Sequence, residues 1–157
     1  MKYKVFNSSN EDVKKFVFEW EKTEACGEAV AESVLYKCGS YMERTVICCS
    51  TQSGCPVKCK FCGTGGFFKR NLTADEIVEQ VKTVLEEVGI GEKEALGIKK
   101  FQLMFMSMGE PFLNYDNLEK AIERLAEIYP SAQLLVSTSA PASIKTRFHD
   151  FIDLSKK

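Results

Sequence analysis

Long apolar runs are missing from this sequence, and so is a basic-then-apolar start, so we expect neither a membrane-spanning helix nor a secretory signal peptide. Net charge is small, because 21 basic residues oppose 22 acidic ones and leave −1. This balance does not favour nucleic-acid binding over the whole surface. Repeats and low-complexity stretches are absent too. We expect a cytoplasmic chain of one core, for which 157 residues with 45% hydrophobic content suffice.

Acidic residues are missing from one stretch of the chain. None lies between Glu43 and Asp75, whereas five basic residues do: Arg44, Lys58, Lys60, Lys69 and Arg70. Such a patch can face the phosphates of a nucleic acid. It can equally balance an anionic cluster and an anionic cofactor, and the two interpretations are compatible.

Cysteine, in contrast, is plentiful. Seven cysteines without a secretion signal indicate a reducing compartment, in which thiols serve metal binding or catalysis. Cys55, Cys59 and Cys62 have the spacing C-x3-C-x2-C, which can hold three irons of a four-iron cluster and leave the fourth iron open. A structural zinc loop or unconnected buried thiols are the alternatives, although zinc sites more often contain two separated C-x2-C pairs. Phe61, just before the last cysteine, can pack beside an adenine or be an ordinary core aromatic.

The periodicity of the sequence predicts an α/β fold. Alternating Phe16, Phe18 and Trp20 indicate a strand, and Thr73-Ala74-Asp75-Glu76 is a capping box that begins a helix. The expected strands span 15–20, 29–38, 44–50, 101–106 and 133–137, and the expected helices span 73–88, 116–128 and 141–151. The first strands form a small antiparallel sheet, with no strand before residue 15, and the later strands alternate with helices and run parallel. We divide the chain into a small β accessory segment, 1–43, and a parallel core, 44–157.

Three polar loops follow strands of this core: the cysteine loop and the segments 108–111 and 137–139. Loops at the carboxyl ends of parallel strands share one rim, where such folds bind their ligands. Gly109 allows a ligand close to the backbone, and the Glu110 carboxylate can hold an ammonium group. Ser137 can hydrogen-bond the same ligand. A simple turn and a strand-end turn residue are the alternatives for these two segments.

Four linked motifs resemble the radical S-adenosylmethionine (SAM) superfamily and, within it, the RlmN/Cfr-type 23S rRNA adenine methyltransferases. Cys48-Cys49-Ser50-Thr51-Gln52-Ser53-Gly54-Cys55 is similar to C-x-S-S-Q-x-G-C of that family. Phe68-Lys69-Arg70-Asn71-Leu72-Thr73-Ala74-Asp75-Glu76-Ile77 resembles its F-x-R-N-L-x-x-x-E-I. Met106-Ser107-Met108-Gly109-Glu110-Pro111 resembles M-G-M-G-E-P, and Val136-Ser137-Thr138-Ser139 resembles L-S-T-S-G, with Ala140 in place of the glycine.

The resemblance implies a role for each matching residue. The cysteine triad would ligate a [4Fe-4S] cluster, and reductive cleavage of SAM would give a 5'-deoxyadenosyl radical for RNA methylation. Residues implied to contact SAM are Phe61, Gly109, Glu110 and Ser137. Cys48 matches a catalytic thiol that resolves a covalent protein–RNA intermediate, and Glu32 matches a proton acceptor. A buried strand thiol and an exposed strand charge are the alternatives for these two residues.

The resemblance also sets expectations about size and partners. The superfamily core has about six parallel strands, so the roughly three strands expected here imply the first half of a radical-SAM barrel, preceded by the small antiparallel sheet. None of the seven cysteines matches the C-terminal cysteine that carries the methyl group. The partners implied are RNA (rRNA or tRNA), a reductant such as flavodoxin or ferredoxin, and a complementing chain. The alternatives are a radical-SAM enzyme with another substrate, and a non-catalytic Fe-S or zinc-binding fragment that pairs with another chain.

Overall fold

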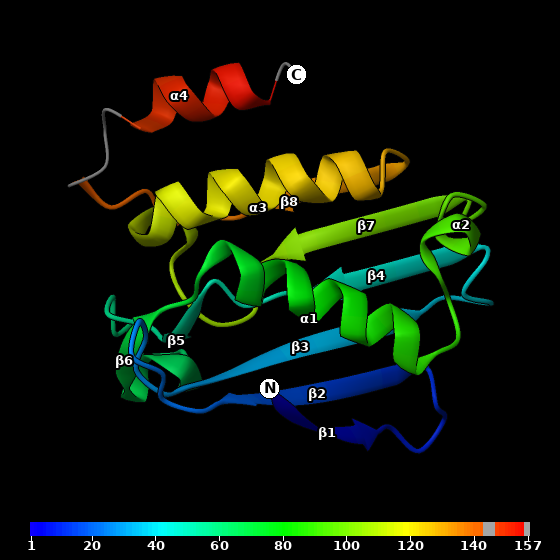
Figure 1. The fold of residues 1–157 in the computed structure, drawn as a ribbon, viewed down its shortest axis with the longest axis horizontal. Helices are drawn as coiled ribbons and strands as arrows, with labels where there is room; N and C mark the ends of the chain where they lie inside the picture. The colour runs from blue at the N-terminus through cyan, green and yellow to red at the C-terminus, as the bar shows by residue number, and fades with distance from the viewer. Residues whose placement is uncertain (143–146, 156–157) are drawn as a thin grey trace.

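Six strands form one mixed sheet in the computed structural model, which describes residues 1–142 and 147–155 (Figure 1). Their order across the sheet is β1-β2-β3-β4-β7-β8. The strands are β1 (Lys2–Asn7), β2 (Val13–Trp20), β3 (Ala29–Lys37), β4 (Arg44–Cys48), β7 (Lys100–Phe105) and β8 (Ala132–Val136). Neighbours from β1 to β4 pair antiparallel, whereas β4, β7 and β8 run parallel. The predicted α/β class, with parallel strands after an antiparallel start, is confirmed.

Strand β4 joins the antiparallel and parallel parts of the sheet. Cys48 at its end lies opposite Val34 of antiparallel β3 and opposite Met104 of parallel β7. The segments 1–43 and 44–157 therefore share one continuous sheet. The division of the chain into an accessory segment and a core stays a prediction.

Strand β1 corrects the expectation that no strand precedes residue 15. It pairs with β2 along its whole length, and Tyr3 and Val5 lie opposite Phe18 and Phe16. The strand is hard to predict because its alternation, Lys2-Tyr3-Lys4-Val5, covers only four residues and is broken by Phe6. Every residue of β1 except the half-buried Val5 is also exposed. Lysines on such an exposed edge discourage pairing with another chain.

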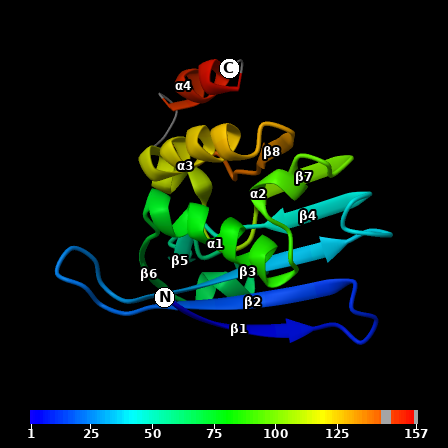
Figure 2. The ribbon, with the colours of Figure 1, turned by 45° about the vertical axis from the view of Figure 1, so that its right-hand side comes forward.

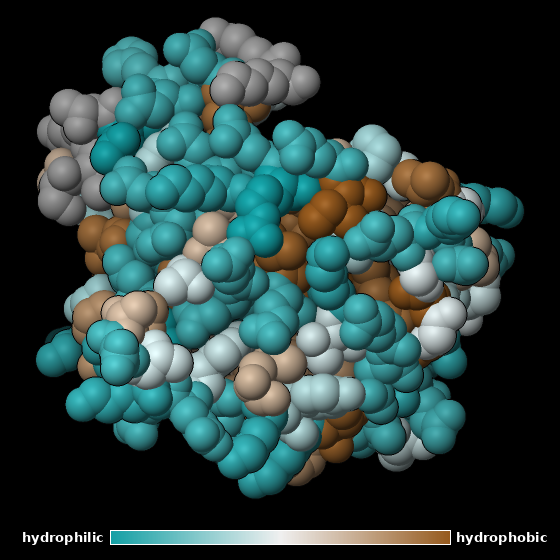
Figure 3. Space-filling model, viewed as in Figure 1, coloured by the Kyte–Doolittle hydropathy of each residue, from teal (hydrophilic) through white to brown (hydrophobic). Residues whose placement is uncertain are grey.

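Helices α1 and α3 cover one face of the sheet (Figures 1 and 2). The capping box of α1 is formed, since Thr73 Oγ1 accepts from the Glu76 N–H at 3.2 Å and the Glu76 carboxylate accepts from the Thr73 N–H at 2.9 Å. The surface over these helices is mainly hydrophilic (Figure 3). None of the helices within 1–142 and 147–155 is long and apolar enough to cross a membrane. The helices are α1 (Ala74–Glu87), α2 (Glu92–Ala95), α3 (Tyr115–Ile128) and α4 (Arg147–Leu154).

Helix α4 replaces part of the helix predicted over 141–151. Pro141 is not helical, and residues 143–146 lie outside the described residues. From Arg147 onward α4 packs beside the start of α3, where Arg147 pairs with Asp116 at 2.8 Å. Phe148 and Phe151 both meet, edge to face, the ring of Phe112, which lies just before α3.

The pleat of the strands sorts side chains to two faces. Phe16, Phe18 and Ile47 belong to the core beneath the helices. Alternate positions, among them Glu32 and Cys48, point to the opposite face. No α-helix in the described part of the chain covers that second face, which we call the helix-free face and define by Lys15, Val17, Glu32, Val34, Cys48 and Met104.

Candidate functional site

A short hairpin frames the cysteine loop. Strand β5 (Gln52–Gly54) pairs antiparallel with β6 (Phe68–Asn71), and the Cys55 N–H closes the hairpin by donating to the Phe67 carbonyl at 2.9 Å. Gly54 has φ 82°, and a Cβ at this position would collide with the Phe67 carbonyl. Only glycine fits there, because the left-handed conformation and the close backbone both exclude a side chain. The hairpin thus brings the two ends of the cysteine loop together.

The three thiols of the loop are free. Cys55 and Cys59 are half-buried and Cys62 is exposed. The Cys62 N–H donates to the Cys59 carbonyl at 3.0 Å, so the last two thiols sit on one turn. The backbone N–H of Thr64, then its hydroxyl, and also the N–H of Gly65 lower the pKa of the Cys62 thiol. This favours the thiolate, which is the form that binds a metal.

The donor set of this loop fits a metal or an iron–sulfur cluster. Among residues 1–142 and 147–155, no three cysteine, histidine or acidic side chains are already arranged around a metal position. The fit rests instead on chemistry, since three soft thiol ligands suit iron–sulfur clusters or zinc. No carboxylate lies between Glu43 and Asp75 to compete with them. Cys55, Cys59 and Cys62 stay predicted ligands.

Gly109 follows β7 and touches the start of the hairpin. It has φ 105°, and a Cβ there would lie 2.7 Å from Gln52 Cβ and 2.9 Å from Gln52 N. The need for glycine therefore comes from a neighbour within the chain, not only from an approaching ligand. The Thr51 and Gln52 N–H groups both donate to the Met108 carbonyl, at 2.9 and 3.3 Å.

Glu110 links the loop after β7 to the loop after β8. Its carboxylate is 5% exposed and accepts from the Phe112 N–H at 3.1 Å, the Ser139 N–H at 2.8 Å, the Ser139 hydroxyl at 2.7 Å and the Thr138 hydroxyl. The prediction that these two loops share a rim is confirmed. A carboxylate offers about four acceptor sites, so an incoming ammonium group would take the place of one of these donors.

Ser137 is placed differently from its two neighbours. It is exposed and donates no hydrogen bond to a residue that the structure describes, whereas Thr138 and Ser139 hold Glu110. The sequence predicted no separate role for Thr138 and Ser139. The available signal was two hydroxyl side chains in a segment expected on the same rim as the Glu110 carboxylate. The contact between Ser137 and a cofactor stays a prediction.

Glu32 is anchored to the rim through its backbone. Its carbonyl accepts from Ser50 Oγ at 2.5 Å and from Ser107 Oγ at 2.9 Å, and these serines precede the cysteine loop and the Gly109–Glu110 segment. Its carboxylate lies 2.7 Å from the Lys15 ammonium. Glu32 therefore reaches the helix-free face close to both loops, while its proton-acceptor role stays a prediction.

Cys48 and Cys49 are neighbours with opposite environments. Cys48 is half-buried on the helix-free face, and Cys49 is fully buried in the core beneath the helices. Burial raises the pKa of the Cys48 thiol, an effect partly offset by the Met106 backbone. Burial also raises the pKa of Cys49 well above its ordinary value. Burial therefore favours the neutral thiol in both residues, and the catalytic role of Cys48 stays a prediction.

Phe61 is more exposed, and the basic stretch is more paired within the chain, than the sequence alone indicates. The Phe61 side chain is 94% exposed, so it is not a core aromatic. Lys69 pairs with Glu28 at 2.6 Å and Arg44 donates to a glutamine, Gln102, at 3.0 Å. Of the five basic residues, Lys58 and Lys60 are therefore the exposed ones without an ion pair to a described residue. The charge available to phosphates is smaller than the sequence indicated.

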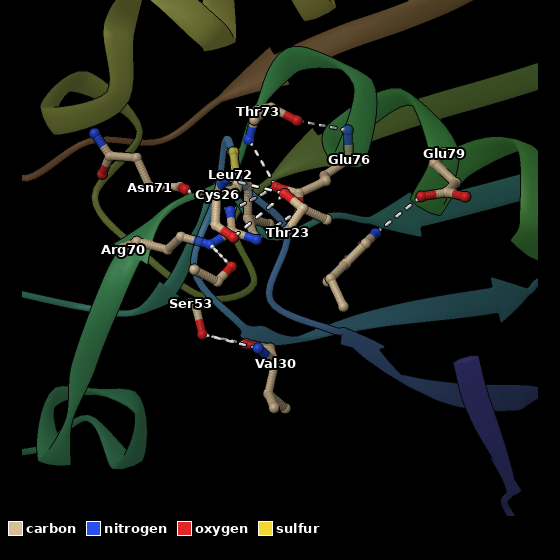
Figure 4. Close-up of polar contacts among 12 residues, drawn as sticks. Thr23, Cys26, Val30, Ser53, Arg70, Asn71, Leu72, Thr73, Glu76 and Glu79 are labelled. Atoms are coloured by element: carbon tan, nitrogen blue, oxygen red, sulfur yellow. Dashed lines mark hydrogen bonds and ion pairs between the residues drawn. The ribbon is translucent and has the colours of Figure 1, made fainter. Parts of the chain in front are cut away.

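Arg70 lies in β6, the strand that follows the cysteine loop, and fixes that strand to neighbouring segments (Figure 4). Its guanidinium makes two 2.7 Å bonds to the Glu76 carboxylate and donates to the carbonyls of Gly27 at 2.7 Å and Asn71 at 2.9 Å. Glu76 also accepts from the Thr73 N–H. One ion pair thus connects β6, the first turn of α1 and the β2–β3 connection.

Replacing Glu76 with glutamine is expected to lower the free energy of unfolding by about 2 kcal/mol, because the Arg70 charge, only 17% exposed, loses its partner. Urea unfolding followed by circular dichroism measures the change. Glu86→Gln, on the exposed side of the same helix, is the control and should stay within about 0.5 kcal/mol of the parent. Equal stability of the two variants would contradict the assigned role of the ion pair.

Comparisons with known proteins give matches over most of the chain. A family model described as the radical SAM superfamily matches residues 49–153. The chain is 50% identical over 101 residues to a protein named "Probable dual-specificity RNA methyltransferase RlmN" of Heliobacterium modesticaldum, covering 62% of this chain and 25% of that protein. Proteins of the same name from Koribacter versatilis and Thermotoga maritima are each 41% identical, over 120 and 112 residues, covering 74% and 71% of this chain and 33% and 28% of those proteins. The chain therefore spans a quarter to a third of the length of these curated relatives.

Proposed function

Because the chain belongs to the radical SAM superfamily, we propose that it supplies the cluster-binding and cofactor-binding part of an RNA adenine methyltransferase. The observation that carries the proposal is the convergence at one rim. The base of the cysteine loop contacts the Gly109–Glu110 segment, and Glu110 in turn contacts the loop after β8. The identity to proteins named as dual-specificity RNA methyltransferases supports RNA as the substrate, and the motif resemblance makes adenine C2 of rRNA the proposed target.

The cofactors proposed for this rim are a [4Fe-4S] cluster and SAM. Cys55, Cys59 and Cys62 would hold three irons of the cluster. When bound and reduced, the cluster supplies the electron that cleaves the SAM sulfonium and yields the 5'-deoxyadenosyl radical. Gly109 and Glu110 would bind the ammonium end of the methionine moiety.

Further residues of the chain would orient the ligand and handle the proton. The exposed Phe61 ring would pack beside the adenine of SAM, and Ser137 would hydrogen-bond the cofactor from the end of β8. Glu32, whose carboxylate lies 2.7 Å from the Lys15 ammonium on the helix-free face, would accept the proton of the adenine ring. Cys48, a neutral thiol on the same face, would resolve the protein–RNA intermediate after losing its proton.

The same proposal assigns the architecture and the partners. Strands β4, β7 and β8 would be the first part of a radical-SAM barrel, with the helix-free face turned toward its interior. A complementing segment or chain would close the barrel and carry the methyl-bearing cysteine. RNA would approach the rim near Lys58 and Lys60, and a reductant such as flavodoxin or ferredoxin would deliver the electron.

The test is anaerobic reconstitution of the chain, followed by metal analysis and incubation with dithionite and SAM. We expect about four irons per chain and 5'-deoxyadenosine detectable by mass spectrometry. Zinc in place of iron, or no cleavage of SAM, would overturn the proposal and favour a binding fragment. A second arm adds an rRNA fragment and the C-terminal part of a relative as a separate chain. Cleavage without RNA methylation in that arm would favour an enzyme with a different substrate.

A further inference from the structure

The Gln52 side chain lies between the cysteine hairpin and the Gly109–Glu110 segment. It is 1% exposed. Its Nε2 donates to Asn71 Oδ1 across the hairpin at 2.7 Å, and its Oε1 accepts from the Glu110 N–H at 2.8 Å. A side-chain amide can donate and accept at once without carrying a charge, which few other side chains of this length can do.

The packing around Gln52 leaves it little freedom. Its Cβ and Cγ occupy the space that a side chain at Gly109 would need, at 2.7 and 2.8 Å from an added Cβ. Its own N–H donates to the Met108 carbonyl at 3.3 Å. The backbone N–H, the Cβ and Cγ, and the side-chain amide of Gln52 therefore contact Met108, Gly109 and Glu110, respectively, in the segment after β7.

Two other amides reinforce the same junction. Asn114 Nδ2 donates to the carbonyls of Thr51 and Leu72, both at 2.7 Å, and these residues flank the hairpin on its two sides. Asn71 Nδ2 donates to the Leu113 carbonyl at 3.2 Å. The base of the cysteine loop is thus fastened to residues 110–114 on both of its strands by neutral groups.

A ligand that binds both loops at once needs them at a fixed separation. In the proposed function, the methionine moiety of SAM would contact both the open iron of the cluster and the Gly109–Glu110 segment. Displacement of one loop by a fraction of an ångström weakens such a two-point contact. The cysteines belong to the loop that follows Gly54, at the other end of the hairpin from the Gln52–Asn71 pair, so holding the cluster does not require this amide.

We propose that Gln52 is a positioning residue that fixes the cysteine loop against the Gly109–Glu110 segment and thereby sets the affinity for SAM. The inference rests on the proposed function. It assigns Gln52 no contact with the cofactor.

The test compares the reconstituted parent with Gln52→Met, which keeps the length of the side chain and removes both hydrogen bonds. We expect unchanged iron and sulfide content, because the cysteines are intact. We expect SAM binding, measured by equilibrium dialysis, to weaken about tenfold, and the change that SAM produces in the electron paramagnetic resonance spectrum of the reduced cluster to diminish. In the metal-free chain, hydrogen exchange at the Glu110 amide should quicken roughly tenfold, because its acceptor is gone.

Two further variants separate positioning from folding. Asn71→Ala alters an exposed side chain and should weaken SAM binding in the same direction, with less than additive effect in the double variant. Gln133→Met, an exposed glutamine of β8 that accepts from Gln102, is the matched control and should bind SAM like the parent. Joint loss of iron and SAM in Gln52→Met, or parental SAM affinity in both Gln52→Met and Asn71→Ala, would overturn the inference. Failure of the parent to bind iron or SAM would instead refute the proposed function.

Discussion

Replacing Cys59 with alanine is expected to lower 5'-deoxyadenosine formation by at least about 100-fold, because two thiols cannot hold three irons of the cluster. The change should leave the fold intact, since Cys59 contributes its backbone carbonyl, not its thiol, to the turn that positions Cys62. Iron content, the absorbance of the reconstituted cluster and product formation are measured together on anaerobic samples. Iron content should fall in parallel with activity.

Cys38→Ala is the matched control for this loss. Cys38 is an exposed free thiol just after β3, outside the cysteine loop, so its replacement should keep both the cluster and the activity. A Cys59→Ala chain with a full cluster would refute the ligand assignment. Equal loss in both variants would point to general damage by thiol replacement.

Gly109→Ala is expected to cost about 3 kcal/mol of unfolding free energy, from the left-handed backbone and from the clash with Gln52. The added Cβ would lie 2.9 Å from the Gln52 nitrogen, and backbone cannot move aside as a flexible side chain can. Relief of the clash would push the Glu110 segment away from the hairpin, so SAM affinity should fall as well. Urea unfolding and equilibrium dialysis measure the two effects.

Gly66→Ala tests whether any glycine in this region is equally sensitive. A Cβ at Gly66 meets no atom within 4 Å, and its φ lies outside the left-handed region. This variant should stay within about 0.5 kcal/mol of the parent and bind SAM normally. If Gly109→Ala were as stable as Gly66→Ala, the close packing assigned between Gly109 and Gln52 would be contradicted.

Local sequence signals predicted the elements with strong periodicity. The capping box at Thr73–Glu76 marked the start of α1, and alternating Phe16, Phe18 and Trp20 marked β2. β1 was not predicted, because it is a short and mostly exposed edge strand. The β5–β6 hairpin was not predicted either, because its strands have only three and four residues, which is too short for a periodic pattern, and the cysteine loop separates them.

The candidate site was predictable in outline and not in its contacts. The order of strands and loops placed Glu110 and the segment after β8 on one rim, since carboxyl ends of parallel strands meet there. Which hydroxyls reach Glu110 depends on the direction of the chain after β8, which the motif does not encode. The bond between Gln52 and Glu110 joins residues 58 positions apart, and only the three-dimensional fold brings them together.

Cys48, the last residue of β4, and Cys49, which follows it, have a practical consequence for thiol-labelling experiments. Cys48 and Cys49 are joined by one peptide bond, yet they sample opposite sides of the sheet. A labelling measurement that reports only on the peptide containing both thiols would average a buried core position with a half-buried position on the helix-free face. When the labelling of each thiol is measured separately, the rate at Cys48 reports whether the helix-free face is covered, and the rate at Cys49 reports whether the core is intact.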